Sequence, residues 1–205
     1  MNFTFLIVIV TVLTTLYAFN TPDLYYRLIF FPYRINQTKK EYYRFLTSGF
    51  IHADWNHLIF NMLSLYFVGS NVEEICNQAG VPGAYLVLYI TAIIISSLPA
   101  YFKHKDHSHY LSLGASGGVS AILFMLGYFE PWARVNILFI PFGIPMILFS
   151  VLYVAYSAYM SKKGNDNIGH DAHLWGSVYG FVFAFLLDLK ITGGQTFLYE
   201  LMHPR

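Results

Sequence analysis

Three groups of polar residues stand in stretches of the sequence that are otherwise apolar. His57 and Asn61 are four residues apart, so they share one face of a helix. Ser116 lies two residues after Gly114 in a Gly-Ala-Ser-Gly sequence, and His173 follows fifty-seven positions later. A serine hydroxyl becomes a good nucleophile when a neighbouring base takes its proton, and histidine is the commonest such base. Ser116 and His173 are therefore a candidate catalytic dyad.

The same residues could stabilise the negative oxygen that forms when a serine attacks a carbonyl. Ser116 lies at the start of an expected helix, where backbone N–H groups are free and the helix dipole favours negative charge. His57 and Asn61 can add side-chain donors, and one such donor is typically worth about 10²–10³ in rate. These three residues are the candidate oxyanion hole. Asp171 lies two residues from His173, on a different helix face, so we predict no third member of the catalytic group.

The composition predicts an integral membrane protein. The chain has 205 residues, of which 56% are hydrophobic and 11% charged, with a net charge of +1. A soluble domain carries about 25% charged residues, so these charges are too few to coat a soluble globule. The lack of a basic excess argues against a nucleic-acid partner. A single cysteine, Cys76, excludes an intramolecular disulfide and a cysteine-cluster metal site, and H-E-x-x-H is absent, so we predict no metal and no cofactor.

Charge-free stretches predict an all-α fold of six transmembrane helices in a single domain. A helix needs about 20 apolar residues to cross about 30 Å of hydrocarbon. The predicted spans are residues 3–19, 55–73, 83–102, 115–129, 143–160 and 170–187. The connection 22–54 mixes aromatic and basic residues, which is typical of the headgroup layer, so we expect a folded interfacial loop. Pro141, Gly143 and Pro145 argue against a regular helix before about Met146.

The predicted topology brings the polar groups together. Consecutive spans alternate in direction, so the second, fourth and sixth spans run the same way, and each carries its polar group near its N-terminal end. Small residues let helix backbones approach closely in lipid. Those on the fourth and sixth spans are Gly117, Ala121, Gly176 and Gly180. We therefore expect the His173 imidazole within hydrogen-bond reach of the Ser116 hydroxyl, in a pocket that opens at one membrane surface.

These motifs resemble those of the rhomboid intramembrane serine proteases. The match comprises Gly114-Ala115-Ser116-Gly117, the pair His57 and Asn61, and Ala172-His173 followed by Gly176 and Gly180, in the family's order and over about residues 3–190. The resemblance implies a rhomboid-like helical bundle with Ser116 as nucleophile and His173 as general base. It assigns the oxyanion hole to His57, Asn61 and the backbone N–H of Ser116. It also implies that the partners are single-span membrane proteins in a lipid bilayer, cut within or beside their transmembrane helix.

Three further positions bear on the resemblance. Tyr43-Arg44 stands where the family's first loop usually has a Trp-Arg pair, and Glu73 resembles the acidic residue after the second span. Many members carry an aromatic residue four positions after the nucleophile, packed on the catalytic histidine, but this chain has Ser120 there. Another aromatic residue, such as Trp175, is then expected to hold the His173 ring.

Other functions fit parts of the same pattern. Ser116 alone could be a small packing residue, and His57, Asn61 and His173 alone could be interhelical hydrogen-bonding groups. A non-catalytic rhomboid-like protein that binds membrane proteins or acts in quality control is the main alternative, although such relatives typically lack the serine or the histidine. A transporter or channel would show inverted repeats and polar groups at mid-membrane, which this sequence does not.

We expect a bacterial inner membrane location with the active-site end facing outward, as is usual for the family in bacteria. The positive-inside rule favours the opposite orientation, because nine of the twelve basic residues lie at the active-site end. These nine are Arg27, Arg34, Lys39, Lys40, Arg44, Lys103, Lys105, Lys162 and Lys163.

Overall fold

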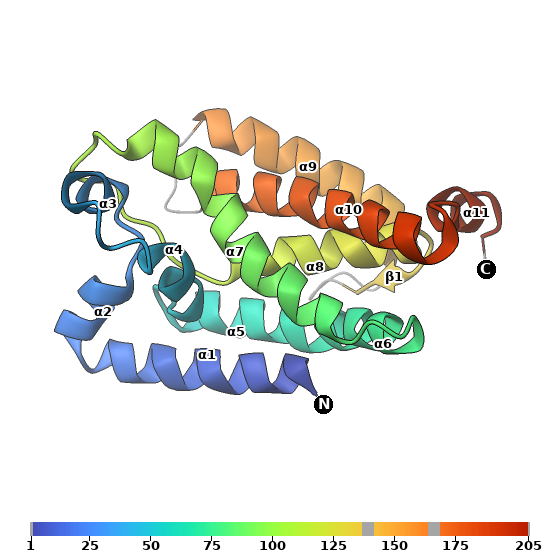
Figure 1. The fold of residues 1–205 in the computed structure, drawn as a ribbon, viewed down its shortest axis with the longest axis horizontal. Coiled ribbons are helices and arrows are strands. Elements are labelled where there is room, and N and C mark those ends of the chain that lie inside the picture. The colour runs from blue at the N-terminus through green and yellow to red at the C-terminus, as the bar shows by residue number, and fades with distance from the viewer. Residues whose placement is uncertain (1, 137–141, 164–168, 205) are drawn as a thin grey trace.

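The structure, a computed structural model, describes residues 2–136, 142–163 and 169–204, and these are mostly helical, as predicted (Figure 1). The α-helices are α1 (Phe3–Phe19), α2 (Pro22–Leu28), α3 (Pro32–Thr38), α4 (Arg44–Thr47), α5 (Trp55–Ser64), α6 (Ser70–Gln78), α7 (Gly83–His104), α8 (Ser116–Phe129), α9 (Met146–Lys163), α10 (His170–Thr192) and α11 (Thr196–Met202). A 3-10 turn covers Ser48–Phe50, and a π-helical segment, Leu65–Gly69, joins α5 to α6. Two short strands, β1 (Arg134–Val135) and β2 (Ile144–Pro145), pair antiparallel before α9.

The observed helices follow the predicted spans closely at their starts and less closely at their ends. The predicted span 55–73 is the continuous run α5, π-helical segment and α6, which extends to Gln78. The helices α7 and α10 end at His104 and Thr192, beyond the predicted residues 102 and 187. The helix α9 runs from Met146 to Lys163, whereas the predicted span was 143–160. Its start agrees with the expectation that no regular helix forms before about Met146; Pro141, on which part of that expectation depended, lies outside the described residues.

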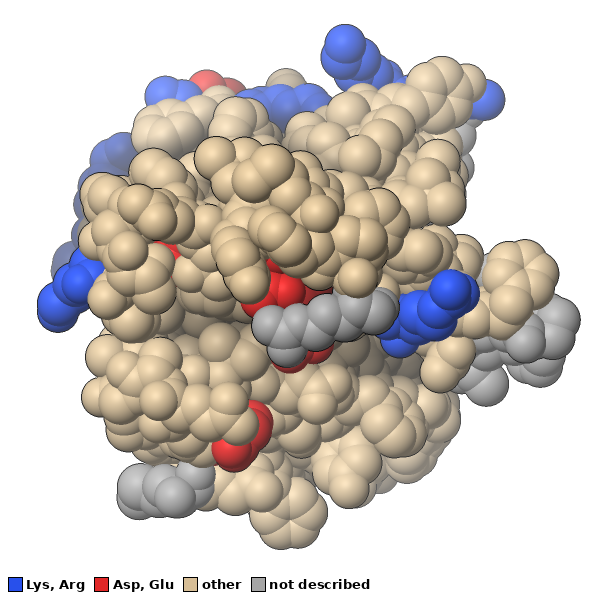
Figure 2. Space-filling view, turned by 90° about the vertical axis from the view of Figure 1, so that its right-hand side faces the viewer, with Lys and Arg blue, Asp and Glu red and all other residues tan. Residues whose placement is uncertain are grey.

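Within the described part of the chain, α7 and α10 are the helices long and apolar enough to cross a membrane by length and composition, with 22 and 23 residues. The helices α1 and α8 are apolar but shorter, with 17 and 14 residues. Large apolar side chains cover the outward faces of the bundle, as Leu13 on α1, Val151 on α9 and Leu186 on α10 illustrate. Figure 2, which looks at the end where α6 and α11 lie, shows few charged residues among uncharged ones. An apolar surface of this extent needs a nonaqueous surrounding.

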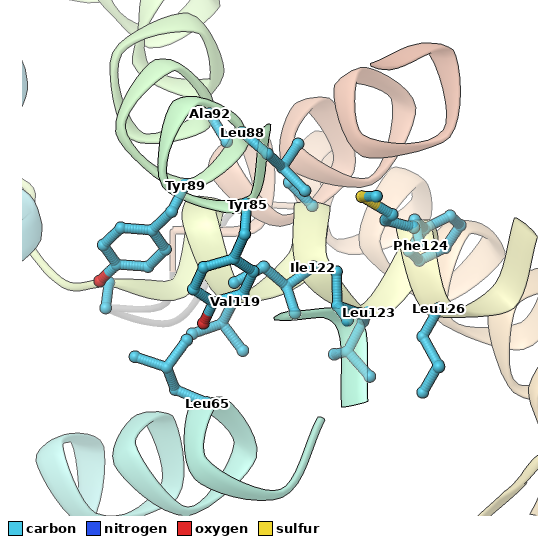
Figure 3. Packing of buried hydrophobic residues seen from close by; sticks show 14 of the residues in the cluster. Leu65, Tyr85, Leu88, Tyr89, Ala92, Val119, Ile122, Leu123, Phe124 and Leu126 are labelled. Carbon is cyan, nitrogen blue, oxygen red and sulfur yellow. The ribbon is translucent and has the colours of Figure 1, made fainter. Parts of the chain in front are cut away.

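The core is built around α8. Every residue of this helix from Gly117 to Tyr128 is buried, because α5, α7, α9 and α10 all pack against it. Figure 3 shows Val119 and Ile122 of α8 between Leu65, which lies below them in the view, and Tyr85 of α7. The first residue of α8 is therefore held by a helix that is itself fixed on all sides.

Two buried carboxylates tie helix ends together far from the first residue of α8. Glu73 accepts hydrogen bonds from the backbone N–H groups of Phe3 (2.6 Å) and Thr4 (2.9 Å), which have no partner within α1. Asp188 accepts from the Tyr128 hydroxyl (2.9 Å) and the Thr196 backbone N–H (3.1 Å), and so joins α8, α10 and α11. Glu73, within α6, thus caps the first helix.

The connection 22–54 is folded, as expected, into α2, α3, α4 and the 3-10 turn. Its centre is Arg44, whose side chain is buried. The guanidinium donates to the backbone carbonyls of Tyr26 and Ile29, each at 2.8 Å, and to the Glu41 carboxylate at 2.5 Å. A guanidinium presents five donors in a fixed fork, so one arginine can hold the end of α2 and the residues before α4 at once.

Candidate active site

The turn before α8 requires glycine at position 114. Gly114 has φ +117°, which side-chain-bearing residues rarely adopt, and its N–H donates to the Ser48 carbonyl at 2.9 Å. A Cβ atom at this position would lie 2.5 Å from Cε1 of His57. The turn therefore runs directly against the His57 ring and delivers Ser116, partly exposed, as the first residue of α8.

The small residues of α8 and α10 meet as the sequence predicted. A Cβ added to Gly176 would collide with the Gly117 carbonyl oxygen and lie 3.0 Å from its carbon, and one added to Gly180 would lie 2.5 Å from the Ala121 Cα. Ser116 directly precedes Gly117, and His173 lies one helical turn before Gly176. The structure thus places the serine and the histidine at the same end of two helices in backbone contact.

The helix α5 presents His57 and Asn61 at this end of the bundle. Asp54 caps the helix by accepting from the His57 backbone N–H at 2.8 Å. The Asn61 side-chain amide donates to the His57 carbonyl at 3.0 Å, which uses one of its two N–H groups within α5. His57 lies against the turn before Ser116, whereas the Asn61 amide is held along its own helix.

A second histidine, His52, supports the same turn, and the sequence analysis did not single it out. Its ring is fully buried, accepts from the Ala115 backbone N–H at 3.4 Å, and lies 3.2 Å from the Thr15 hydroxyl through Nδ1. The ring also packs edge-on against His57, with centroids 4.8 Å apart. The available signal was its position five residues before His57, which adds a third polar residue to the His57 and Asn61 pair.

We predict that His52 makes the fold sensitive to acid. Burial, assisted by neighbouring His57, lowers the pKa of His52 from 6.5 to about 3. Between these two pH values the unfolded chain binds a proton at His52 and the folded chain does not. The free energy of unfolding is therefore unaffected by His52 above pH 6.5 and falls by up to about 1.4 kcal/mol per pH unit towards pH 3. At pH 5 the loss is about 2 kcal/mol. Thermal unfolding in detergent at pH 7.5 and pH 5 should therefore show a smaller pH effect for His52→Gln than for the wild type; equal effects would contradict the assignment.

A small polar cavity lies beside Ser116. Its volume is about 20 Å³, and its walls include the hydroxyl-bearing side chains Ser48, Ser96, Ser97, Ser112 and Ser116. A polar cavity of more than about 10–15 Å³ can hold one water molecule. The site therefore has space for a water molecule next to the candidate nucleophile.

Aromatic rings surround His173. The Tyr153 ring, from α9, stacks on the His173 ring with centroids 5.9 Å apart and planes 24° apart. The His170 ring approaches edge-on at 5.9 Å and is buried. Trp175, which the sequence analysis suggested for this role, is 44% exposed. The ring that stacks on His173 comes from the neighbouring helix.

Asp171 takes part in other contacts, in agreement with its predicted place on a different helix face. Its carboxylate accepts from Lys103 Nζ at 3.3 Å and from the Ser161 hydroxyl, so it joins α10 to α7 and α9. Among the described residues, no group of three or more histidine, cysteine or acidic side chains is arranged to hold a metal ion. His104 and His107 approach each other at 3.2 Å between their Nδ1 atoms, beside the stacked ring of Tyr110.

Fold and site together define a helical membrane bundle whose polar side chains gather at one end of its central helix. Comparison with known proteins agrees, since a family model described as "Rhomboid domain" matches residues 39–189. The chain belongs to the rhomboid family of integral membrane proteins.

Three relatives illustrate the range of the family. RHOMBOID-like protein 12, mitochondrial, of Arabidopsis thaliana is 30% identical over 148 residues, which cover 64% of this chain and 42% of that protein. Rhomboid-like protein 11, chloroplastic, of the same plant is 30% identical over 161 residues, or 72% of this chain and 53% of that protein. Rhomboid protease GluP of Bacillus subtilis is 29% identical over 153 residues, or 75% of this chain and 27% of that protein. The chain thus spans about half, or less, of the length of these relatives.

Proposed function

We propose that this protein is an intramembrane serine endopeptidase that cleaves single-span membrane proteins within or near their transmembrane helix. The observation that carries the proposal is the backbone contact between Gly117 and Gly176. Gly117 directly follows Ser116 and Gly176 lies one turn after His173, so this contact supports a pairing of the two side chains. The named protease among the relatives supports the same reaction. No cofactor is required, because serine, histidine and water suffice for peptide hydrolysis.

The proposed mechanism uses a Ser116–His173 dyad. His173 removes the Ser116 proton as the oxygen attacks the scissile carbonyl, and then transfers that proton to the leaving amine. The backbone N–H of Ser116, together with His57 and Asn61, stabilises the tetrahedral oxyanion. His57 is already beside the turn, whereas Asn61 contributes its second amide N–H, because the first donates to the His57 carbonyl within α5. A water molecule in the serine-lined cavity then attacks the acyl-enzyme. His173 takes the proton of this water and returns it to the Ser116 oxygen as the ester bond breaks, which releases the carboxylic acid product.

The short central helix explains how such a reaction can take place in a membrane. We propose six spans: α1, the α5–α6 run, α7, α8, α9 and α10. A 14-residue helix is about 21 Å long, against about 30 Å of hydrocarbon. If α8 ends at the far surface, Ser116 lies about 9 Å below the near surface, inside the membrane but open to water from that side. A substrate helix must unwind there to expose its backbone.

We also propose a bacterial inner membrane location, with the Ser116 end facing outward. The Bacillus relative supports this location, whereas the plant relatives carry mitochondrial and chloroplastic names. The many basic residues at this end oppose this orientation, but part of their charge is neutralised within the loop, since Arg34 and Arg44 both contact Glu41.

The proposal is tested by covalent labelling and cleavage. Purified wild type is expected to react with a fluorophosphonate serine probe and to cut a single-span reporter, because the dyad raises the nucleophilicity of Ser116. Ser116→Ala should abolish both activities, and His173→Ala should reduce both by at least about 10²-fold. Ser70→Ala, which removes a hydroxyl of α6 that donates to the Tyr66 carbonyl, is the matched control. A wild type that neither labels nor cleaves, in detergent and in lipid, would instead indicate the non-catalytic binding protein.

A further inference from the structure

The position four residues after the candidate nucleophile is occupied by a small residue, and a side chain from another helix fills the space. Ser120 is buried on α8, and its hydroxyl is 2.7 Å from the Tyr153 hydroxyl of α9. The Tyr153 ring spans from this hydrogen bond to the imidazole of His173, on which it stacks. One side chain from α9 therefore contacts both helices of the proposed dyad.

The contacts of Tyr153 fix its ring in two directions. The hydroxyl is held by Ser120, and the ring is flanked by Phe124 of α8 and Phe149 of α9, with centroid distances of 6.0 and 5.5 Å. Because a stacked ring restricts the plane of its neighbour, Tyr153 limits rotation of the His173 side chain. The edge-on His170 ring bounds the imidazole from a different direction.

We propose that Tyr153 is the positioning residue of the His173 base, an inference that rests on the function proposed above. A general base must present its nitrogen to the serine hydroxyl at hydrogen-bond distance, and a misplacement of about 1 Å can cost about 10²-fold in rate. Tyr153 holds the imidazole plane by stacking, and Ser120 holds Tyr153. The Ser120 hydroxyl thus holds, by a hydrogen bond, a ring that comes from a different helix, α9.

The supply of this ring by α9 makes the base depend on the position of that helix. Of the described residues of α9, only Met146 and Ser157 are buried, and the helix presents many of its side chains outward. A displacement of α9 from α8 and α10 separates Tyr153 from Ser120 and from His173 together. The base is therefore fully oriented only while α9 is packed against the other two helices.

The test compares two replacements of Tyr153 by the rate at which a fluorophosphonate probe labels Ser116. This small probe needs an activated serine but no docked transmembrane helix, so its rate reports on the catalytic groups without the step of substrate docking. Tyr153→Phe keeps the stacked ring and should label within about threefold of the wild type. Tyr153→Leu removes the ring and should slow labelling and lower kcat for the reporter by at least about tenfold, with KM changed by less than about twofold. Tyr159→Leu, which removes an exposed ring of the same helix, is the matched control and should stay near the wild type.

Two results would overturn the proposal. One is a wild-type labelling rate in Tyr153→Leu, and the other is an equal slowing in Tyr153→Leu and Tyr159→Leu, which would indicate general loosening of the bundle. If Tyr153→Leu does not fold, the exchange Ser120→Tyr with Tyr153→Ser moves the ring to α8 at nearly constant volume and should restore labelling. Failure of the exchange in a folded protein would also overturn it. Failure of the proposed function is distinguishable, because the wild type itself would then not label.

Discussion

Replacement of Gly176 by alanine is expected to lower the proposed proteolysis strongly and to destabilise the bundle. The added Cβ would collide with the Gly117 carbonyl oxygen and lie within 3.1 Å of the Gly117 Cα. Because all of these are backbone atoms of a fully packed helix, no side chain can rotate to relieve the contact. The helices α8 and α10 must then separate, which moves His173 from Ser116. We expect a fall of at least about 10²-fold in kcat/KM and a loss of stability of about 1–3 kcal/mol, as for other overpacked cores.

Gly83→Ala is the matched control for this prediction. Gly83 is also in a helix, the first residue of α7, but a Cβ there would meet no atom within 4 Å. This variant should therefore keep the activity and the thermal midpoint of the wild type, since alanine is at least as good a helix former as glycine. Reporter cleavage and thermal unfolding in detergent measure both quantities. Full activity in Gly176→Ala would show that the close contact of α8 and α10 is not what brings the serine and the histidine together.

The contact between α8 and α10 was predictable because the spacing of small residues indicates it. Gly117 and Ala121 on one helix, and Gly176 and Gly180 on the other, are each four positions apart, so each pair lies on one face. The direction of the spans then places Ser116 and His173 at the same end of the bundle. A local pattern combined with a topological rule thus determined the central feature of the candidate site.

His52 and Tyr153 could not be placed from the sequence in the same way. Each acts across helices without a local repeat: His52 joins Thr15 of α1 to the Ala115 N–H, and Tyr153 reaches from α9 to Ser120. Aromatic residues make up 19% of the chain, so composition does not indicate which ring faces His173. The small residue at position 120 indicated that another side chain must pack on His173, but it did not indicate which helix provides that side chain.

Helix ends were less predictable than helix centres for a related reason. A hydropathy pattern predicts that a span ends where charged residues begin. The helix α10, however, continues through Asp188 and Lys190 to Thr192. The Asp188 carboxylate does not interrupt the helix because hydroxyl groups of Tyr128 and Thr192 donate to it. The helix α11 was missed because it is only seven residues long, and its first turn depends on that same carboxylate.

Replacement of Gly114 by alanine is expected to lower proteolysis by at least about 10²-fold while the protein remains folded. A residue with a Cβ atom is strained at φ +117°, typically by about 1–2 kcal/mol in the left-handed region, and the added atom would also lie 2.7 Å from Nε2 of His57. The turn must then shift or push the imidazole away. Either movement separates a proposed oxyanion donor from the backbone N–H of Ser116, and the loss of one such donor costs about 10²–10³ in rate.

Gly80→Ala separates backbone strain from displacement of His57. Gly80 also has a positive φ, +72°, but a Cβ at this position would meet nothing within 4 Å. This variant should show a modest fall in thermal midpoint and reporter cleavage close to that of the wild type. In Gly114→Ala the fall should appear in kcat with little change in KM, because the oxyanion forms after the substrate has bound. Equal activity losses in the two variants would attribute the effect to strain alone, and would argue against a role for His57 beside the Ser116 turn.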